Sequence, residues 1–265
     1  MMKRAKAPVL GEQVQVKIPG FGELVEGGIP HGSSILIAGG PGTGKTIFCL
    51  QALYGAALEG STSLYLTMEE LPKRLVRHMG KFGWSAEIAE ETDEGLRLRA
   101  GKGTMLIRRL DPLKAARSIE ALLAKKTGEL AIDLSAADLL PLDPRPHFIT
   151  VDSLSAIESA FVGRPESYRI YIEQLFHALR EVEGVSFLIT ETEEAPSRFS
   201  RSGVEEFLAD GVVVLYNMRV GDSRVRAIEV LKLRGAKHLR KLVPLEITEK
   251  GIVIFPEEKV YGVSP

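Results

Sequence analysis

The sequence predicts an α/β fold in which helices flank a mostly parallel central sheet, with antiparallel strands in the carboxyl-terminal part. Short apolar runs rich in β-branched residues alternate with helical spacing through most of the chain, a pattern typical of parallel strands joined by crossover helices. Helical spacing stops after Gly211, where strand-like runs follow one another across short turns. With 45% hydrophobic and 26% charged residues among 265, the chain has the composition of a globular protein.

The order of the elements follows from local spacing and from turn residues. The run at 33–38 is short, apolar and followed by glycines, so it predicts the first core strand. Residues 45–58 place Phe48 and Ala52 at helical spacing, and a later helix begins at Pro72, where a missing N–H costs least. The remaining expected strands are 62–67, 95–100, 147–152, 185–190 and 211–216; the expected helices are 72–82, 112–125, 134–140 and 167–182; and the antiparallel runs are 225–235, 242–248 and 251–256.

Bulk properties exclude several classes of protein. The formal net charge of −1 gives no global attraction to nucleic acid or to an anionic membrane. No apolar run reaches the ~18 residues of a membrane span, and the basic start of the chain lacks the apolar segment of a signal peptide. The single cysteine, Cys49, rules out an internal disulfide or a cysteine zinc site, and the five histidines are too scattered to form a metal site. We therefore expect a cytoplasmic protein without a membrane span.

Residues 39–46 read GGPGTGKT and satisfy the phosphate-loop pattern G-x-x-x-x-G-K-[ST] between a strand and a helix. Glycines let backbone amides approach an anion, and the free N–H groups at a helix start favour negative charge. Lys45 is expected to reach the β- and γ-phosphates of a nucleotide, and the Thr46 hydroxyl to ligate Mg²⁺. A plain strand-to-helix turn would not need a lysine followed by a threonine. The predicted nucleotide-binding residues are Gly40, Gly42, Thr43, Gly44, Lys45, Thr46 and Ile47.

Three carboxylates follow strands that end at the same edge of the predicted sheet. Asp152 ends the apolar run FITVD, where it could hold Mg²⁺ directly or through water; as an alternative, it could cap the next helix. Glu69 and Glu70 follow the strand after the phosphate-loop helix, and one of them is expected to polarise the water that attacks the γ-phosphate. The alternative for this pair is a solvated helix start. The sequence does not assign separate roles to the two glutamates.

Several motifs, in their order and spacing, resemble the KaiC-type branch of the RecA superfamily of ATPases. They are GGPGTGKT, LYLTMEE, FGW at 82–84, FITVDS, GVEEFLADGVVVL at 203–215 and EVLKLRGAKH at 229–238. The resemblance implies a RecA-like P-loop NTPase core, Mg²⁺-dependent ATP hydrolysis and a homo-oligomeric ring, commonly a hexamer, with ATP between subunits. It also implies an N-terminal extension at 1–17, a single ATPase domain at 18–256 with an insertion within 101–145, and a tail at 257–265.

The resemblance further implies that a second set of residues contacts the ATP held by a neighbouring subunit. Cations supplied in this way would neutralise charge on the γ-phosphate. Without the resemblance, Lys232 and Arg234 would be interpreted as the polar face of an edge strand. Ala236 stands where the family often has threonine, which puts one hydroxyl contact in doubt, and Ile47 stands at another such position without affecting Mg²⁺ binding. The implied set is Lys232, Leu233, Arg234, His238, Thr248 and Glu249.

The leading interpretation is a KaiC-like ATPase whose oligomer changes with nucleotide state and regulates or assembles an unidentified protein partner. An alternative is a recombination ATPase similar to RecA and RadA, with DNA contacted by the loop 193–203, where two arginines supply charge and Phe199 offers a stacking surface. Two glutamates in the loop offset that charge, so nucleic-acid binding is not favoured. A third interpretation is a scaffold that binds ATP without hydrolysing it. Autophosphorylation stays open.

Overall fold

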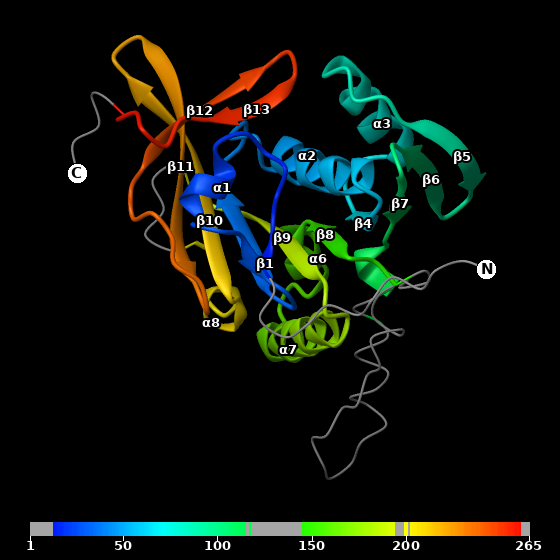
Figure 1. Ribbon diagram of the computed structural model, residues 1–265. Coiled ribbons are helices and arrows are strands. Elements are labelled where there is room, and N and C mark those ends of the chain that lie inside the picture. Colours follow the sequence, from blue (N-terminus) through cyan, green and yellow to red (C-terminus); the bar gives the residue numbers. More distant parts are fainter. Residues whose placement is uncertain (1–12, 115–116, 118–144, 194–198, 201, 261–265) are drawn as a thin grey trace.

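The computed structural model describes residues 13–114, 117, 145–193, 199–200 and 202–260. Within these residues, eleven strands form one sheet, and β1 (Gln13–Val14) pairs with β2 (Ile29–Pro30) as a separate antiparallel ribbon (Figure 1). In sheet order, the eleven strands are β13 (Gly251–Ile254), β12 (Val243–Thr248), β11 (Ser223–Leu233), β10 (Gly211–Val220), β3 (Ser34–Gly39), β9 (Val185–Glu191), β8 (Phe148–Asp152), β4 (Thr62–Thr67), β7 (Gly103–Arg109), β6 (Gly95–Ala100) and β5 (Glu87–Thr92).

The centre of the sheet is parallel, and both of its sides are antiparallel. Strands β10, β3, β9, β8, β4 and β7 run in the same direction. On one side, β11, β12 and β13 continue the sheet in antiparallel fashion, which confirms the arrangement expected for the carboxyl-terminal part. On the other side, β7, β6 and β5 form an antiparallel meander, of which only β6 was expected. The predicted α/β class with a mostly parallel central sheet is confirmed.

Helices cover both faces of the parallel centre (Figure 1). Along β3, Ile35 and Ile37 belong to the core cluster that includes α2, whereas Leu36 and Ala38 belong to the cluster that includes α7. Consecutive strand residues point to opposite faces, so burial of both faces requires a continuous apolar run. The helices are α1 (Phe21–Leu24), α2 (Lys45–Leu58), α3 (Pro72–Lys81), α6 (Leu154–Ala160), α7 (Pro165–Glu181) and α8 (Glu205–Leu208).

Most element boundaries agree with those expected from the sequence. Helix α7 begins earlier than expected, because Pro165 occupies its first turn. Helix α6 was not expected. Of the helix expected at 112–125, the structure describes only 112–114 and 117, and the helix expected at 134–140 lies outside the described residues. Among the described residues, no helix combines the length and the apolar character needed to cross a bilayer.

Two observations bear on the expected domain limits. Val16 is buried in the core cluster that includes α2, so the packed chain begins before Ile18, the first residue of the expected ATPase domain. An insertion is expected somewhere within residues 101–145; of these, residues 103–109 form β7 between β4 and β6 and belong to the central sheet. An insertion stays a proposal only for the residues after β7.

The register of the parallel strands brings the predicted site residues to one edge of the sheet. Gly39 at the end of β3 pairs with Glu191 of β9, and Thr67 at the end of β4 pairs with Asp152 of β8. The phosphate loop follows Gly39, and the two glutamates come shortly after Thr67. The carboxyl edge of the sheet therefore collects the loop and all three predicted carboxylates, as is usual for sites in parallel α/β sheets.

Candidate functional site

The phosphate loop connects β3 to α2 across the carboxyl edge of the sheet. A Cβ atom at Gly39 would lie 2.4 Å from the carbonyl oxygen of Leu215 on β10, so the close approach of the two strands requires glycine. Gly44 caps α2 with a left-handed φ of 102°, a conformation that side chains disfavour. The Thr43 hydroxyl closes the loop by donating to the Gly40 carbonyl oxygen at 2.9 Å. These contacts explain why the motif has glycine at positions 39 and 44.

Lys45 is buried and folds back onto the loop. Its Nζ atom donates to the carbonyl oxygens of Gly39 at 2.7 Å and of Gly40 at 2.9 Å. Burial lowers the pKa of Lys45, and nearby carboxylates oppose this effect, in the order Glu191, Asp152 and Glu69. The ammonium group therefore lies where phosphate oxygens would compete with loop carbonyls for its protons. Ile47, the last residue of the predicted loop set, packs half-buried against the core cluster that includes α2.

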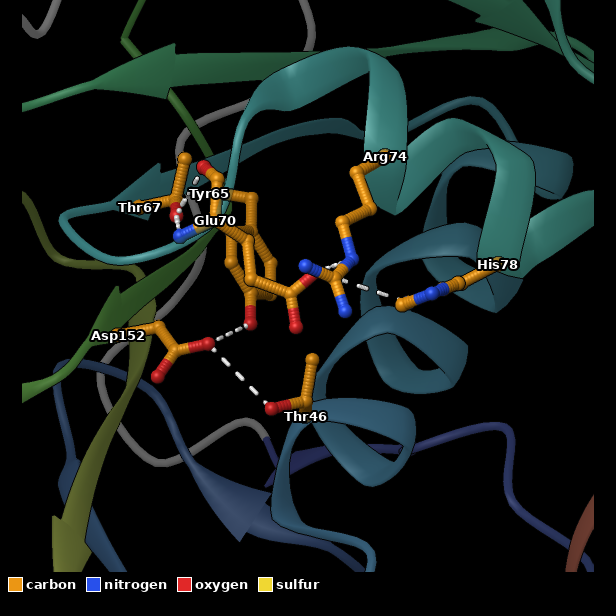
Figure 2. A network of polar contacts seen from close by, with 7 residues as sticks. All are labelled: Thr46, Tyr65, Thr67, Glu70, Arg74, His78 and Asp152. Atoms are coloured by element: carbon orange, nitrogen blue, oxygen red, sulfur yellow. Dashed lines mark hydrogen bonds and ion pairs between the residues drawn. The ribbon is translucent and has the colours of Figure 1, made fainter.

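Asp152 lies within a buried hydrogen-bond network (Figure 2). The hydroxyls of Tyr65 on β4 and of Thr46 on α2 both donate to its Oδ2 atom, and the bond from Thr46 measures 3.4 Å. Burial raises the pKa of Asp152 to about 6, the hydrogen bond from Tyr65 acts in the opposite direction, and the charge of Glu69 adds to the rise. Burial also raises the pKa of Tyr65, so the phenol keeps its proton and acts as the donor.

The oxygens of Thr46 and Asp152 fit the requirements of a magnesium ion. Octahedral Mg²⁺ places adjacent ligand oxygens about 3 Å apart, because its bonds are about 2.1 Å long. The separation of 3.4 Å between Thr46 Oγ1 and Asp152 Oδ2 is close to that value. No group of three or more His, Cys, Asp or Glu side chains able to hold a metal occurs among the described residues. Magnesium commonly takes its remaining ligands from water and from substrate phosphates.

Ser153 bears on the alternative role of Asp152 as a helix cap. The Ser153 hydroxyl oxygen caps helix α6 by accepting a hydrogen bond from the backbone N–H of Ala156 at 3.2 Å. The same hydroxyl donates to Glu69 Oε1 at 2.8 Å. Helix capping is therefore the task of Ser153 and not of Asp152. The bond to Glu69 also ties the first glutamate to the chain segment that carries Asp152.

The Glu70 carboxylate lies beside two basic side chains of helix α3 (Figure 2). Its Oε2 atom lies 3.4 Å from Arg74 Nε and 3.7 Å from His78 Nδ1. The turn before the helix is fixed by Thr67, whose hydroxyl donates to the Glu70 carbonyl oxygen at 2.8 Å and accepts from the Glu70 N–H at 3.1 Å. Helix α3 has Leu71 at its N-cap, so neither glutamate caps it. The structure thus separates two residues that the sequence could not distinguish.

Of the residues implied to act on a neighbour's ATP, Lys232, Leu233 and Arg234 lie away from the chain's own phosphate loop. Leu233 pairs with Gly211 of β10, and Gly211 pairs with Ile35 near the amino end of β3. The phosphate loop starts after Gly39, which is about 13 Å further along the strand at the usual rise per residue. Leu233 is buried in the core, whereas Arg234 is exposed. This segment therefore lies at the edge of the sheet opposite to the loop of the same subunit.

Lys232 and Arg234 make hydrogen bonds within their own chain. Lys232 Nζ donates to the carbonyl oxygens of Glu206 at 3.0 Å and Ala209 at 2.6 Å, and Arg234 Nη2 donates to that of Phe207 at 3.1 Å. Burial and the charge of Arg234 lower the pKa of Lys232. All three acceptors belong to α8 or to its carboxyl end, so this short helix positions both cations.

The other implied residues are more scattered. His238 is half-buried and lies in the segment between β11 and β12. Thr248 ends β12, and its hydroxyl donates to the Gly251 carbonyl oxygen at 2.8 Å across the turn to β13, where Glu249 is exposed. The neighbouring Lys250 carbonyl oxygen accepts from Trp84 Nε1 at 3.0 Å, so this turn is anchored near α3 of the same chain. Within one chain, Thr248 and Glu249 are not brought together with Lys232.

Arg226 is a candidate residue that sequence reasoning missed. Its Nε atom donates to the carbonyl oxygen of Gly42 at 3.1 Å, within the phosphate loop of the same chain. Its cross-strand partner Asn217 lies beside the same glycine, with Nδ2 3.6 Å from the position of a Cβ atom. The hairpin β10–β11 therefore places a guanidinium next to the loop. Only the register of this hairpin could have indicated it, because Arg226 carries no motif of its own.

The loop that the DNA-binding alternative relied on is only partly described. Residues 194–198 and 201, which include both of its arginines, lie outside the described residues. Phe199 packs against the core cluster that includes α7, and its backbone N–H donates to Glu206 Oε1 at 2.6 Å. Phe199 is therefore part of the protein's own packing and not a free surface for stacking a base.

A model of the KaiC ATPase family matches residues 14–259. The chain belongs to the KaiC family of ATPases. It is 30% identical over 249 residues to the circadian clock oscillator protein KaiC of Synechococcus elongatus, which covers 92% of this chain but only 44% of that protein. The chain thus spans less than half the length of that relative. A UPF0273 protein of Thermotoga maritima is 29% identical over 256 residues, covering 93% of this chain and 97% of that one.

A solved structure shows the same architecture. The crystal structure of a KaiC-like protein from the hyperthermophilic archaeon Pyrococcus horikoshii matches with a TM-score of 0.69 and 30% identity, covering 92% of this chain and 99% of that chain. The resemblance to the KaiC-type branch of the RecA superfamily is therefore confirmed, together with the RecA-like fold. The family match also makes this chain a P-loop ATPase domain.

Proposed function

We propose that this KaiC-family protein hydrolyses ATP with Mg²⁺ at the carboxyl edge of its sheet and acts as a nucleotide-dependent oligomer that regulates or assembles a protein partner. The observation that carries the proposal is the convergence of Lys45, Thr46 and Asp152 with Glu69 around one loop. A cation, two metal-side oxygens and a carboxylate for water are the parts that phosphoryl transfer to water requires. The circadian role belongs to the longer relatives and is not part of this proposal.

Nucleotide binding is assigned to the phosphate loop and to the two metal-side oxygens. Backbone amides of the loop and the Lys45 ammonium would hold the β- and γ-phosphates, with Lys45 exchanging its bonds to Gly39 and Gly40 for phosphate oxygens. Thr46 and Asp152 would hold Mg²⁺. When bound, this ion neutralises negative charge on the phosphate oxygens.

Glu69 is the carboxylate that we assign to the attacking water. The Ser153 hydroxyl orients its Oε1 atom, and its charge acts on both Lys45 and Asp152, so it lies near the phosphate site. Water attacks the γ-phosphorus while the bond to the β–γ bridging oxygen breaks, which yields ADP and phosphate. Glu69 would orient the water and accept its proton late in the step. Glu70, held by Arg74 and His78, would support this arrangement from the side of α3.

The proposal includes a ring, with a hexamer as its expected form, in which ATP lies between subunits. Lys232 and Arg234 lie opposite to their own phosphate loop, which supports the proposal that they serve the loop of another subunit. At that loop they would neutralise charge that develops on the γ-phosphate. Their hydrogen bonds to carbonyl oxygens near α8 hold them in place before a neighbour binds.

The test combines phosphate release with mass determination in solution. Purified protein is measured with Mg-ATP, with Mg-ADP and without nucleotide, beside the variant Lys45→Ala as a control for contaminating ATPases. We expect steady phosphate release that needs Mg²⁺ and is lost in the variant, and an oligomer whose population depends on the nucleotide. Phosphate release equal in both proteins, or no release despite nucleotide binding, would overturn the enzymatic part. A monomer under all three conditions would overturn the ring.

A further inference from the structure

Tyr65 places a phenol under the proposed magnesium site. It lies in the middle of β4, is fully buried, and donates its hydroxyl to Asp152 Oδ2 on the neighbouring strand. Register explains the contact: Thr67 pairs with Asp152, and Tyr65 is two residues earlier, on the same face of the sheet. Its long side chain spans that diagonal and ends beneath the start of α2, where Thr46 lies (Figure 2).

A purely structural reason does not account for this hydroxyl. Phenylalanine would fill the same apolar space among β4, β8 and α2 without burying a polar atom, and a buried hydroxyl is costly unless it is hydrogen-bonded. Here the hydroxyl meets a carboxylate, which gives a charge-assisted bond stronger than one between neutral groups. Tyr65 and Thr46 both point at Oδ2, so together they restrict the rotation of the carboxylate.

We propose that Tyr65 is a positioning residue that holds Asp152 for Mg²⁺ and thereby couples Mg²⁺ to nucleotide binding. Thr46 must turn its oxygen to the ion when Mg²⁺ binds, and this leaves Tyr65 as the donor that still holds the carboxylate from inside the core. The inference rests on the proposed function, because it needs the phosphate loop to bind a magnesium nucleotide. It adds a residue that neither the phosphate-loop motif nor the aspartate motif contains.

The chain offers a matched control at Tyr171. This second tyrosine is also buried, on α7 at the other face of the sheet, and its hydroxyl has no hydrogen-bond partner among the described residues. Tyr65→Phe and Tyr171→Phe therefore remove the same atom from two buried sites. Only the first removal touches Asp152.

The experiment measures nucleotide affinity without requiring turnover. A fluorescent ADP analogue is titrated into wild type, Tyr65→Phe, Tyr171→Phe and Asp152→Asn, once with Mg²⁺ and once with EDTA. For Tyr65→Phe we expect affinity in EDTA within about twofold of wild type, but a gain from Mg²⁺ that is smaller by roughly tenfold, as expected for loss of a hydrogen bond to a charged group. Tyr171→Phe should keep the full gain. Binding of Mn²⁺ followed by electron paramagnetic resonance gives a direct second readout.

A double variant separates positioning from general destabilisation. If Tyr65 acts through Asp152, the pair Tyr65→Phe and Asp152→Asn should lose no more of the gain from Mg²⁺ than Asp152→Asn alone. Additive losses, an unchanged gain in Tyr65→Phe, or equal weakening with Mg²⁺ and with EDTA would each overturn the positioning role. Wild type that binds the analogue with no gain from Mg²⁺ would instead refute the metal site of the proposed function, a result distinguishable from failure of Tyr65 alone.

Discussion

Glu69 and Glu70 are adjacent in the chain, but their carboxylates have different partners. Glu69 accepts from the hydroxyl of Ser153, next to Asp152, whereas Glu70 lies with Arg74 and His78 on α3. The charge of Glu69 also acts on the buried Lys45 ammonium. The two glutamates are therefore not interchangeable.

The first prediction concerns these two residues. Glu69→Gln should lower ATP hydrolysis by about 100-fold or more, the usual loss when a general base is removed, and should leave ATP binding intact. Glu70→Gln keeps the shape of the side chain near Arg74 and His78, so we expect a loss below about tenfold. Phosphate release and nucleotide titration measure the two effects. A larger loss in Glu70→Gln than in Glu69→Gln would reverse our assignment.

The second prediction concerns the cost of burying Asp152. Its pKa is about 6 in the folded protein against 3.8 ordinarily, so the folded state is stabilised by this group below pH 4 and loses that stability as pH rises through 6. At pH 7.5 the cost is about 3 kcal/mol at most. Without nucleotide and metal, Asp152→Asn should therefore be more stable than wild type at pH 7.5, and by a smaller margin at pH 5.

Urea unfolding in EDTA at both pH values measures this difference. Mg-ADP should reverse the order at pH 7.5, because wild type gains binding energy that the asparagine variant lacks. If Asp152→Asn proves less stable than wild type at pH 7.5 in EDTA, burial does not destabilise this carboxylate as stated.

The third prediction tests whether active sites are shared between subunits. The variant Lys45→Ala lacks a working loop, and the double variant of Lys232→Ala with Arg234→Ala lacks the cations for a neighbour. Each alone should be inactive. Random mixing in equal amounts should complete about a quarter of the sites, since a site needs its loop from one variant and its cations from the other.

Phosphate release from the mixture, with mass determination to confirm mixed oligomers, measures the recovery. Circular dichroism of the double variant shows whether α8 and its surroundings stay folded. Mixed oligomers that remain inactive would refute the shared site.

The fourth prediction concerns Arg226. Its bond to the Gly42 carbonyl oxygen steadies the phosphate loop, so Arg226→Ala should weaken ATP binding by roughly three- to tenfold. Arg219→Ala is the matched control, because Arg219 lies on the same hairpin but donates to Gly221 in the exposed turn. Equal affinities of both variants, measured by nucleotide titration, would show that Arg226 does not support the loop.

The sequence predicted the parts of the fold in which each strand is buried on both faces. Strands β3, β8 and β9 are largely apolar runs, and α2 begins at a motif, so local sequence patterns were sufficient to predict these elements. The strand β5 was missed because all six of its residues are exposed, so it lacks any hydrophobic pattern. The strand β7 was missed although it is apolar, since its place between β4 and β6 depends on a crossover that local spacing does not reveal.

The residues of the candidate site likewise fall into two groups: those that a local sequence motif indicates and those that only strand pairing brings to the site. Lys45, Thr46 and Asp152 belong to motifs in which neighbouring residues indicate the chemistry, so the sequence alone makes them candidates. The contacts of Tyr65, Ser153 and Arg226 depend on which strands pair and in which register. None of these residues departs from ordinary composition, and only the packed structure shows what their side chains touch.

The phosphate loop and Lys232 lie at opposite ends of the parallel strands, so the two sides of each subunit differ. In the proposed ring, the phosphate-loop side of one subunit contacts the Lys232 side of the next, so every contact is head-to-tail. In that arrangement, an open chain of subunits would leave the phosphate loop at one end without cations from a neighbour. Closure of the ring would bring cations to that last loop, so the rate of ATP hydrolysis per subunit would report whether the ring is closed.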